Sequence, residues 1–201
     1  AELVGAGKLD CAVIYNPIAH DAVELRPLTS ESLYLVSGPQ AAREGRVPPR
    51  AVRLESLPDL PLVIAGKNNV VHGVLAAALA ERGLTAHVVH EIENLTAILD
   101  LIRHGYGYSV IPLSGVQPCI GDPELRLHRI DRPSLECGLS IAIPSSAGND
   151  ALIAASTALL REVVLKELKQ YQMEVESAID EQTDVSPDNQ TTSKVRRAPR
   201  R

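Results

Sequence analysis

The stretch that decides the predicted fold is Glu91-Ile-Glu-Asn-Leu-Thr-Ala-Ile-Leu-Asp-Leu-Ile-Arg-His-Gly-Tyr-Gly-Tyr-Ser-Val-Ile-Pro112. Asn94 stands where a helix N-cap belongs, because its side chain can accept a hydrogen bond from a free backbone N–H. The apolar residues after it recur at helical spacing, namely Leu95, Ile98, Leu99 and Ile102. Gly105 is typical of a left-handed helix stop, and residues 108–111 form a β-rich run closed by Pro112. The stretch predicts a helix followed by a strand.

The segment before this stretch has the same pattern. Residues 62–64 form an apolar run typical of a buried strand, and a polar loop follows. A helix is predicted over 70–82, with Gly83 as its stop, and a strand over 88–92. The order β-α-β-α-β predicts a doubly wound, mostly parallel sheet with right-handed crossovers. Ligands bind at the carboxyl edge of such sheets, so loops 65–69 and 93–96 are the candidate binding edge.

The first third of the chain is less regular. Residues 9–15 are expected to form a buried, parallel-type strand, and 20–28 an irregular connection. A strand is expected over 33–36. Residues 38–58 are rich in Pro, Gly, Arg and Ala, which favours a linking loop outside the core.

The last third adds two strands and a helix. Alternating apolar residues predict strands over 125–130 and 139–143, and a helix is expected from about 150. Beyond about 170 the composition turns strongly polar, which predicts a disordered tail with a basic end at 194–201. A solvated tail without function is the more common case for such a charge run.

Composition excludes several classes of protein. The chain has 201 residues, 45% of them hydrophobic, so it can bury a core as one or two compact units. Twenty basic against 25 acidic residues give a formal charge of −5, which implies no general attraction to nucleic acid or to an anionic membrane. The three cysteines form no CxxC pair, and neither a signal peptide nor a membrane span is expected from the sequence. A cytoplasmic protein with reduced thiols is expected.

Three stretches together resemble one known family. The quoted stretch resembles the effector-binding domain of LysR-type transcriptional regulators. The same is true of Gly7-Lys-Leu-Asp-Cys-Ala12, which is similar to the family's "G-x-L-D-x-A" strand, and of Glu31-Ser-Leu-Tyr-Leu-Val36, which is similar to its "E-x-L-x-L-V" strand. Tyr15-Asn-Pro17 and Leu60-Pro-Leu-Val-Ile64 are most similar to the subgroup of the nitrogen assimilation control protein. The resemblance runs from about residue 4 to residue 164.

The resemblance implies a two-lobed α/β fold of the type-2 periplasmic-binding-protein kind, with doubly wound sheets. It implies a first lobe made of residues 1–37 and 137–171, a second lobe of 38–136, and a tail of 172–201. Residues 38–58 and 130–137 are the expected crossovers between the lobes, and the helix after 150 is expected to pack on the first lobe. The first lobe is expected to be incomplete at its N-terminus, because the family places a strand-helix-strand unit and a helix-turn-helix domain before it.

The resemblance also implies a function and partners. We expect the chain to bind a small, anionic effector in the cleft between the lobes and so to control transcription. Promoter DNA is expected to be bound only through the separate helix-turn-helix domain. A homodimer or homotetramer is expected, and no membrane partner.

Eight residues are the predicted effector contacts. They are Tyr15, Asn16, Gly66, Lys67, Asn68, Asn94, Leu95 and Thr96. Backbone N–H groups at a helix start favour an anion, and Lys67 adds a positive charge. The alternative for residues 66–69 is an ordinary solvated loop, and the alternative for Asn94 and Thr96 is that they only cap their helix.

No catalytic, metal or cofactor site is expected. His87 and His90 are three apart in a predicted strand, so they point to opposite faces, and no helical zinc motif is present. There is also no nucleophile elbow and no dinucleotide fingerprint. Two alternatives remain open: a periplasmic solute-binding protein of a transporter, and an enzyme on the same scaffold with Glu91 or Glu93 as its acid or base.

Overall fold

The computed structural model describes residues 1–147 and 150–184. Within them, eight strands form one branched sheet of order β1-β8-β2-β6-β4-β5, in which β7 also pairs with β2 and carries β3. The strands are β1 (Ala12–Tyr15), β2 (Val23–Ser37), β3 (Ala51–Arg53), β4 (Leu62–Ile64), β5 (Val88–Glu91), β6 (Tyr108–Pro112), β7 (Arg126–Asp131) and β8 (Glu136–Pro144). The α-helices are α1 (Glu2–Gly5), α2 (Pro39–Glu44), α3 (Val70–Ala80), α4 (Leu95–Arg103) and α5 (Ala151–Asp184).

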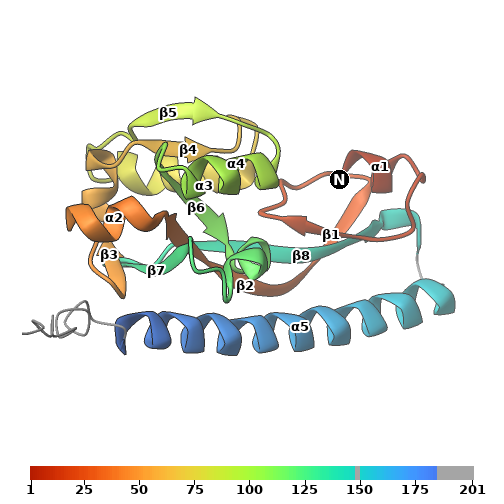
Figure 1. Cartoon of the computed structure of the whole chain (residues 1–201). Helices are drawn as coiled ribbons and strands as arrows, with labels where there is room; N and C mark the ends of the chain where they lie inside the picture. The colour runs from red at the N-terminus through yellow and green to blue at the C-terminus, as the bar shows by residue number, and fades with distance from the viewer. Residues whose placement is uncertain (148–149, 185–201) are drawn as a thin grey trace, which may run out of the picture.

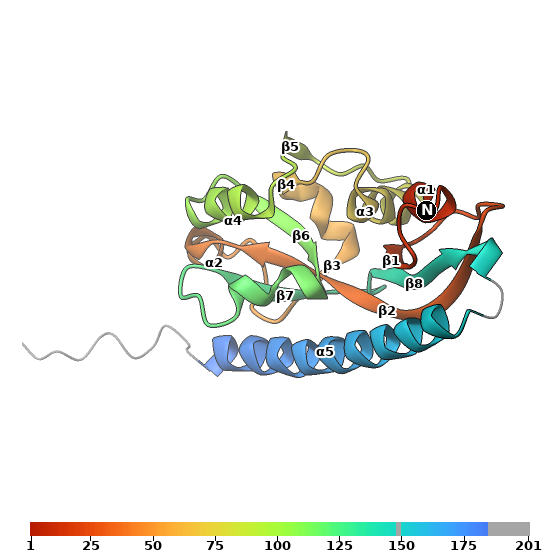
Figure 2. The same cartoon turned by 90° about the vertical axis from the view of Figure 1, so that its right-hand side faces the viewer.

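Strand β2 joins two lobes. From Val23 to Ser32 it pairs with β8, and from Leu33 to Ser37 it pairs with β6 and β7. The first crossing between the lobes therefore lies inside β2, and the prediction that 38–58 form this crossover is wrong. The chain returns through the short connection between β7 and β8, inside the predicted second crossover. Figures 1 and 2 show the resulting two-lobed α/β architecture.

The second lobe contains the β-α-β-α-β unit expected from the sequence. Strands β5, β4 and β6 lie side by side and parallel. Helices α3 and α4 cover its opposite faces: Leu75 and Leu79 of α3 belong to one core cluster, and Ile98 and Ile102 of α4 to another. The whole sheet is mixed, however, because β2 pairs antiparallel with β6, β7 and β8. The expectation of a mostly parallel sheet thus holds only for this unit.

Local signals explain where the two helices begin and end. The Oδ1 atom of Asn94 accepts the backbone N–H of Ala97 at 3.1 Å, as predicted for the cap of α4. Gly105 follows α4 with φ of 79°, a backbone conformation that residues other than glycine rarely adopt. Asn69 caps α3 in the same way, accepting the N–H of Val71 at 2.9 Å. These caps place the amino ends of α3 and α4 at the carboxyl edge of the parallel strands.

Two segments expected to be irregular are ordered parts of the fold. Residues 38–58 contain α2, β3 and most of the 3₁₀ helix η1 (Leu54–Asp59), and five of their apolar side chains are buried: Ala41, Val47, Val52, Leu54 and Leu57. The prediction of a linking loop outside the core is therefore wrong. It was based on the content of proline and arginine, which does not reveal the buried apolar residues between them. Residues 23–28, expected to be an irregular connection, form the start of β2.

Strand β1 differs from its prediction in direction and burial. It pairs antiparallel with β8 and with no other described strand. All four of its residues are only half-buried. A strand with a neighbour on one side alone leaves the backbone groups of its other edge unpaired.

Helix α5 is longer than predicted and spans both lobes. Its 34 residues give a length of about 51 Å. Val164 and Leu165 pack against the core of the first lobe, and Val175 and Ile179 against the α4 side of the second. Figure 2 shows α5 running under both parts of the sheet. The prediction of a disordered tail is therefore wrong for 172–184, and its remainder, 185–201, lies outside the described residues.

Candidate functional site

A cavity of about 260 Å³ opens at the carboxyl edge of β4 and β6. Its wall is mostly apolar and combines the starts of α3 and α4 with the end of β6 and one side chain from β1. The lining residues are Tyr15, Ala65, Asn69, Val70, Val71, Glu93, Leu95, Ile98, Ser109, Val110, Ile111, Pro112 and Gly115. The volume lies just below the ~300 Å³ at which pockets for drug-sized ligands begin, so it suits a small metabolite.

The amino ends of two helices meet at this cavity. Val70 and Val71 open α3, and Leu95 opens α4. The first N–H groups of a helix have no partner within it and carry partial positive charge. Neither first turn contains an acidic residue. Both helix ends can therefore attract an anionic group of a ligand.

A hydrogen-bonded chain connects the two lobes beside the cavity. The hydroxyl of Tyr15 lies 2.9 Å from Oγ of Ser114, which belongs to the 3₁₀ helix η2 (Leu113–Gly115). The carboxylate of Glu31, which is 2% exposed, accepts the N–H of Ser114 at 2.8 Å and its hydroxyl at 3.2 Å. Burial, with Glu31 acting in the same direction, raises the pKa of Tyr15 to about 12. The phenol therefore stays protonated across the physiological range.

The wall of the cavity includes the carboxylate of Glu93 and the buried hydroxyl of Ser109. A Cβ added at Gly66 would overlap the carboxylate of Glu93, so the missing side chain leaves room for this carboxylate. Ser109 is 1% exposed, and its Oγ has no hydrogen-bond partner in the described structure. A buried polar group without a partner costs free energy, which a bound ligand can recover.

Two of the eight predicted residues, Tyr15 and Leu95, line the cavity. The other six do not. Asn94 caps α4, and Oδ1 of Asn16 accepts the N–H of Gly138 at 2.7 Å. Lys67 lies 4.0 Å from Glu91 with its side chain 80% exposed. Gly66 is buried against Glu93, while Asn68 and Thr96 are exposed without lining the cavity.

Sequence reasoning missed Glu31, Ser109 and Ser114. Nothing in the local sequence shows that Ser109 lacks a partner or that Glu31 meets Ser114, because each property depends on residues distant in the chain. Glu93 begins the predicted binding edge 93–96, but it was assigned no contact with the effector and a chemical role only in the alternative of an enzyme. Its position directly before a helix cap, at the end of a parallel strand, is the signal that places it at the binding edge.

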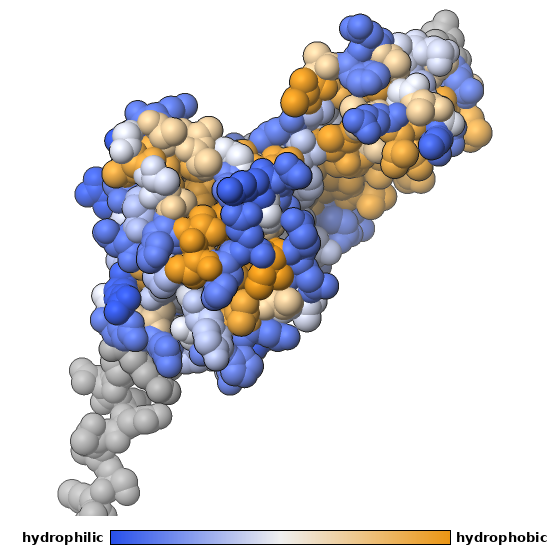
Figure 3. Space-filling model, turned by 90° about the horizontal axis from the view of Figure 1, so that it is seen from above, coloured by the Kyte–Doolittle hydropathy of each residue, from blue (hydrophilic) through white to orange (hydrophobic). Residues whose placement is uncertain are grey.

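A second hollow, of about 660 Å³, lies beside β1 and is lined by residues from the first 20 of the chain. Its surroundings expose three apolar side chains, those of Leu3, Leu9 and Ile18. Figure 3 shows this smaller arm of the molecule, which carries α1 and β1, with apolar side chains gathered on it. Asn16 lines this hollow rather than the cavity at α3 and α4.

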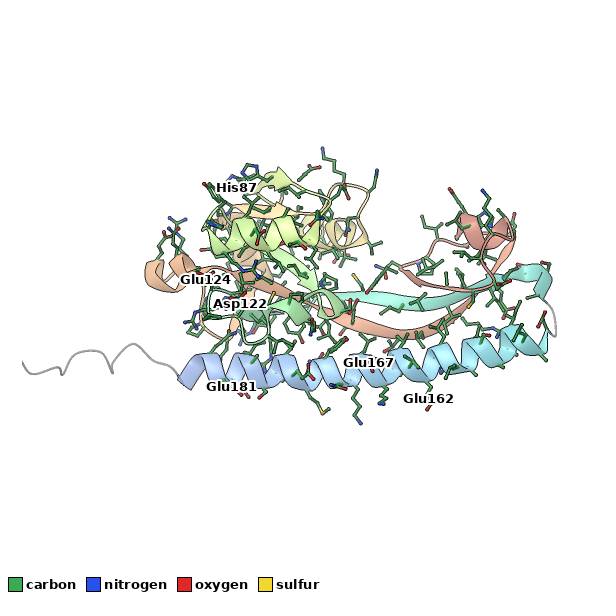
Figure 4. All side chains as sticks on the ribbon, turned by 45° about the vertical axis from the view of Figure 1, so that its right-hand side comes forward. His87, Asp122, Glu124, Glu162, Glu167 and Glu181 are labelled. Atoms are coloured by element: carbon green, nitrogen blue, oxygen red, sulfur yellow. The ribbon has the colours of Figure 1, made fainter. Side chains whose placement is uncertain are left out.

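Other kinds of site find little support in the described part of the chain. No group of three or more His, Cys, Asp or Glu residues there could hold a metal ion. His87 lies at the outer edge of the second lobe (Figure 4). Asp122, on the loop before β7, forms an ion pair with Arg103 at 2.9 Å and fixes that loop to α4 (Figure 4). Among 1–147 and 150–184, no helix combines the length and apolarity of a membrane span.

The family model described as "LysR substrate binding domain" matches residues 1–165. The chain belongs to this LysR family. It is 28% identical over 169 residues to the nitrogen assimilation regulatory protein nac of Escherichia coli, covering 83% of this chain and 53% of that protein. The corresponding protein of Klebsiella aerogenes is 29% identical over 136 residues, or 68% of this chain and 43% of that protein. This LysR-family chain thus spans about half the length of these curated relatives, which are regulators.

Solved structures agree with the fold. A cysteine mutant of OxyR from Corynebacterium glutamicum matches with a TM-score of 0.70 at 20% identity, over 92% of this chain and 54% of that one. The effector-binding domain of QuiR in complex with shikimate matches with a TM-score of 0.60 at 17% identity, over 72% of this chain and 66% of that one. The two-lobed architecture is therefore shared with LysR-family regulators.

Proposed function

We propose that this chain is the ligand-sensing part of a LysR-type transcriptional regulator and that its effector binds in the cavity between α3 and α4. The observation that carries the proposal is the meeting of the amino ends of α3 and α4 with Tyr15, a side chain from the other lobe. A ligand there touches both lobes at once. Its higher affinity for the closed arrangement can therefore shift the balance between open and closed forms.

Tyr15 and Leu95 are the predicted residues that we assign to direct contact with the effector. Gly66 and Asn94 act by positioning, the first through the space that it leaves for Glu93 and the second through the start of α4. The other four predicted residues are assigned no contact with the effector and are proposed only to lie near the binding edge. They are Asn16, Lys67, Asn68 and Thr96.

The proposal for the whole protein goes further. It is a cytoplasmic homodimer or homotetramer that binds promoter DNA through a separate helix-turn-helix domain, and it is not an enzyme. The family match and the regulatory relatives support this assignment over a transporter-linked solute-binding protein. QuiR, whose effector-binding domain holds shikimate, supports small carboxylic acids as the first compounds to test.

The test is a thermal-denaturation screen of the purified chain against small carboxylates and amino acids. A true effector at a hundredfold excess over its Kd stabilises the chain by about 2.7 kcal/mol, or roughly 5–10 °C in Tm. Val71→Phe, which fills the cavity, should abolish the shift. Val163→Phe, at an exposed position of α5, is the matched control and should keep it. A ligand that stabilises Val71→Phe as much as the original chain would show that it binds elsewhere.

A further inference from the structure

The charges around the cavity do not suit a simple anion. Lys67, the cation expected to bind it, lies beside Glu91 with a side chain 80% exposed, and it is absent from the cavity wall. The charged side chain that does line the wall is Glu93. A carboxylate at the cavity repels an anionic ligand unless that ligand also carries a positive group for it. The wall thus presents a negative side chain next to the partly positive ends of two helices.

The surroundings of Glu93 keep its carboxylate available at the cavity. No ion pair joins Glu93 to a cation among the residues that the structure describes, whereas Glu91, two residues earlier, has Lys67 at 4.0 Å. Gly66 offers no Cβ, and any Cβ there would displace the Glu93 carboxylate. Two positions on neighbouring strand ends therefore combine to place one unpaired acceptor at the mouth of the cavity.

A second, independent observation points to a ligand. Ser109 is almost completely buried in the cavity wall, and its hydroxyl has no partner among the described residues. Buried hydroxyl groups without partners are uncommon in folded proteins, because their desolvation is left uncompensated. An oxygen of a ligand carboxylate beside Ser109 would accept a hydrogen bond from this hydroxyl.

We infer that the cavity selects an apolar α-amino acid, with Glu93 as the residue that recognises its ammonium group. This inference rests on the proposed function and names the class of its ligand. The ligand carboxylate lies at the amino ends of α3 and α4, where the first N–H groups other than those capped by Asn69 and Asn94 have no partner within their helix. The ammonium group donates to Glu93, as a charge-assisted hydrogen bond requires. The ligand side chain lies against the aliphatic wall, formed by Val70, Val71, Leu95, Ile98 and Val110.

Glu93 also has a purely structural alternative. A negative charge just before a helix stabilises the positive end of that helix, and Glu93 directly precedes the cap of α4. A substitution of Glu93 that lowers stability would agree with either role. Only a comparison of the binding of ligands with and without an ammonium group separates these two roles of Glu93.

The experiment compares three probes by calorimetric titration of the purified chain: L-leucine, 4-methylpentanoate, which lacks the amine, and 3-methylbutan-1-amine, which lacks the carboxylate. The original chain should bind leucine at least about tenfold more tightly than either analogue, since 4-methylpentanoate leaves Glu93 without a partner and 3-methylbutan-1-amine leaves the helix N–H groups without one. Glu93→Gln should remove the preference for leucine over 4-methylpentanoate. Glu91→Gln, which alters a carboxylate outside the cavity wall, is the matched control and should keep it.

Three results would overturn the inference. If 4-methylpentanoate binds the original chain as tightly as leucine, the cavity takes carboxylates and the proposed function stands without the amino-acid preference. If Glu93→Gln keeps the full preference for leucine, Glu93 has only its structural role. If leucine fails to bind, and isoleucine and valine titrated in the same way also fail, the ligand class is wrong, and the broader screen with Val71→Phe decides separately on the cavity itself.

Discussion

The hydroxyl of Tyr15 lies 2.9 Å from Oγ of Ser114, although the two residues are 99 positions apart in the chain. Tyr15 belongs to β1 in the first lobe and Ser114 to η2 in the second. The buried carboxylate of Glu31 accepts both the N–H and the hydroxyl of Ser114, and so fixes its orientation. This side-chain bond thus ties the two lobes at the wall of the cavity.

Replacing Tyr15 by phenylalanine should weaken this tie. We expect Tyr15→Phe to lower the free energy of unfolding by about 1 kcal/mol, because one hydrogen bond is lost while the ring stays in place. Urea denaturation measures the change. Tyr106→Phe is the control, since Tyr106 is 60% exposed and its hydroxyl has no described partner. Equal stability of the two variants would mean that the bond between Tyr15 and Ser114 contributes nothing.

Acid should destabilise the chain through His128. This side chain is 2% exposed, with Nε2 at 2.7 Å from Oγ of Ser37 and Nδ1 at 2.9 Å from the carbonyl oxygen of Pro48. Burial, helped by the charge of Arg126, lowers the pKa of His128 from 6.5 to about 4. Between these two values the unfolded chain binds a proton that the folded chain does not. Stability contributed by neutral His128 is therefore present above about pH 6.5 and lost as the pH falls toward 4, by roughly 3 kcal/mol.

The measurement is the free energy of unfolding at several pH values between 7 and 4. His128→Gln should show a smaller loss over this window, because glutamine takes up no proton. His87→Gln changes an exposed histidine and should follow the original chain. If His128→Gln has the same pH dependence as the original chain, another group causes the acid sensitivity.

The cap of α4 should contribute measurably to stability. Asn94→Ala removes the acceptor of the Ala97 N–H and should cost about 1 kcal/mol, because the first turn of a helix has no other partner for this group. Asn68→Ala changes an exposed asparagine that caps no helix and should stay within about 0.5 kcal/mol of the original chain. Chemical denaturation of the two variants in parallel tests the assignment, which fails if they lose the same stability.

The last part of α5 should be essential to the second lobe. Ile179 is fully buried against the α4 side of the sheet, and Ile179→Ala should cost about 2–5 kcal/mol through lost burial and a remaining cavity. Met173→Ala lies on the same helix at 59% exposure and should cost less than about 0.5 kcal/mol. A small effect at both positions would mean that residues 172–184 detach from the lobe in solution.

The residues of the candidate site show which of its features could be predicted from the sequence. Asn94 and Leu95 were identifiable because a helix start is a local event, set by one cap and the apolar spacing after it. The partners of Glu31 and the absence of a partner for Ser109 were not, since both depend on strands that meet only in the folded chain. Lys67 was predicted to contact a ligand because the sequence shows its positive charge. The sequence does not show that the side chain of Lys67 lies beside Glu91.

The sequence by itself determined the β-α-β-α-β unit of the second lobe, the Asn94 cap of α4 and the strand edge at which the helices of this unit begin. These features follow from short-range periodicity and capping, which involve residues a few positions apart. Only the tertiary structure decided that β2 carries the chain from one lobe to the other and that α5 continues to Asp184. The physical reason is that α5 is stabilised along its length by burial against both lobes, and burial of this kind depends on contacts between residues distant in the chain.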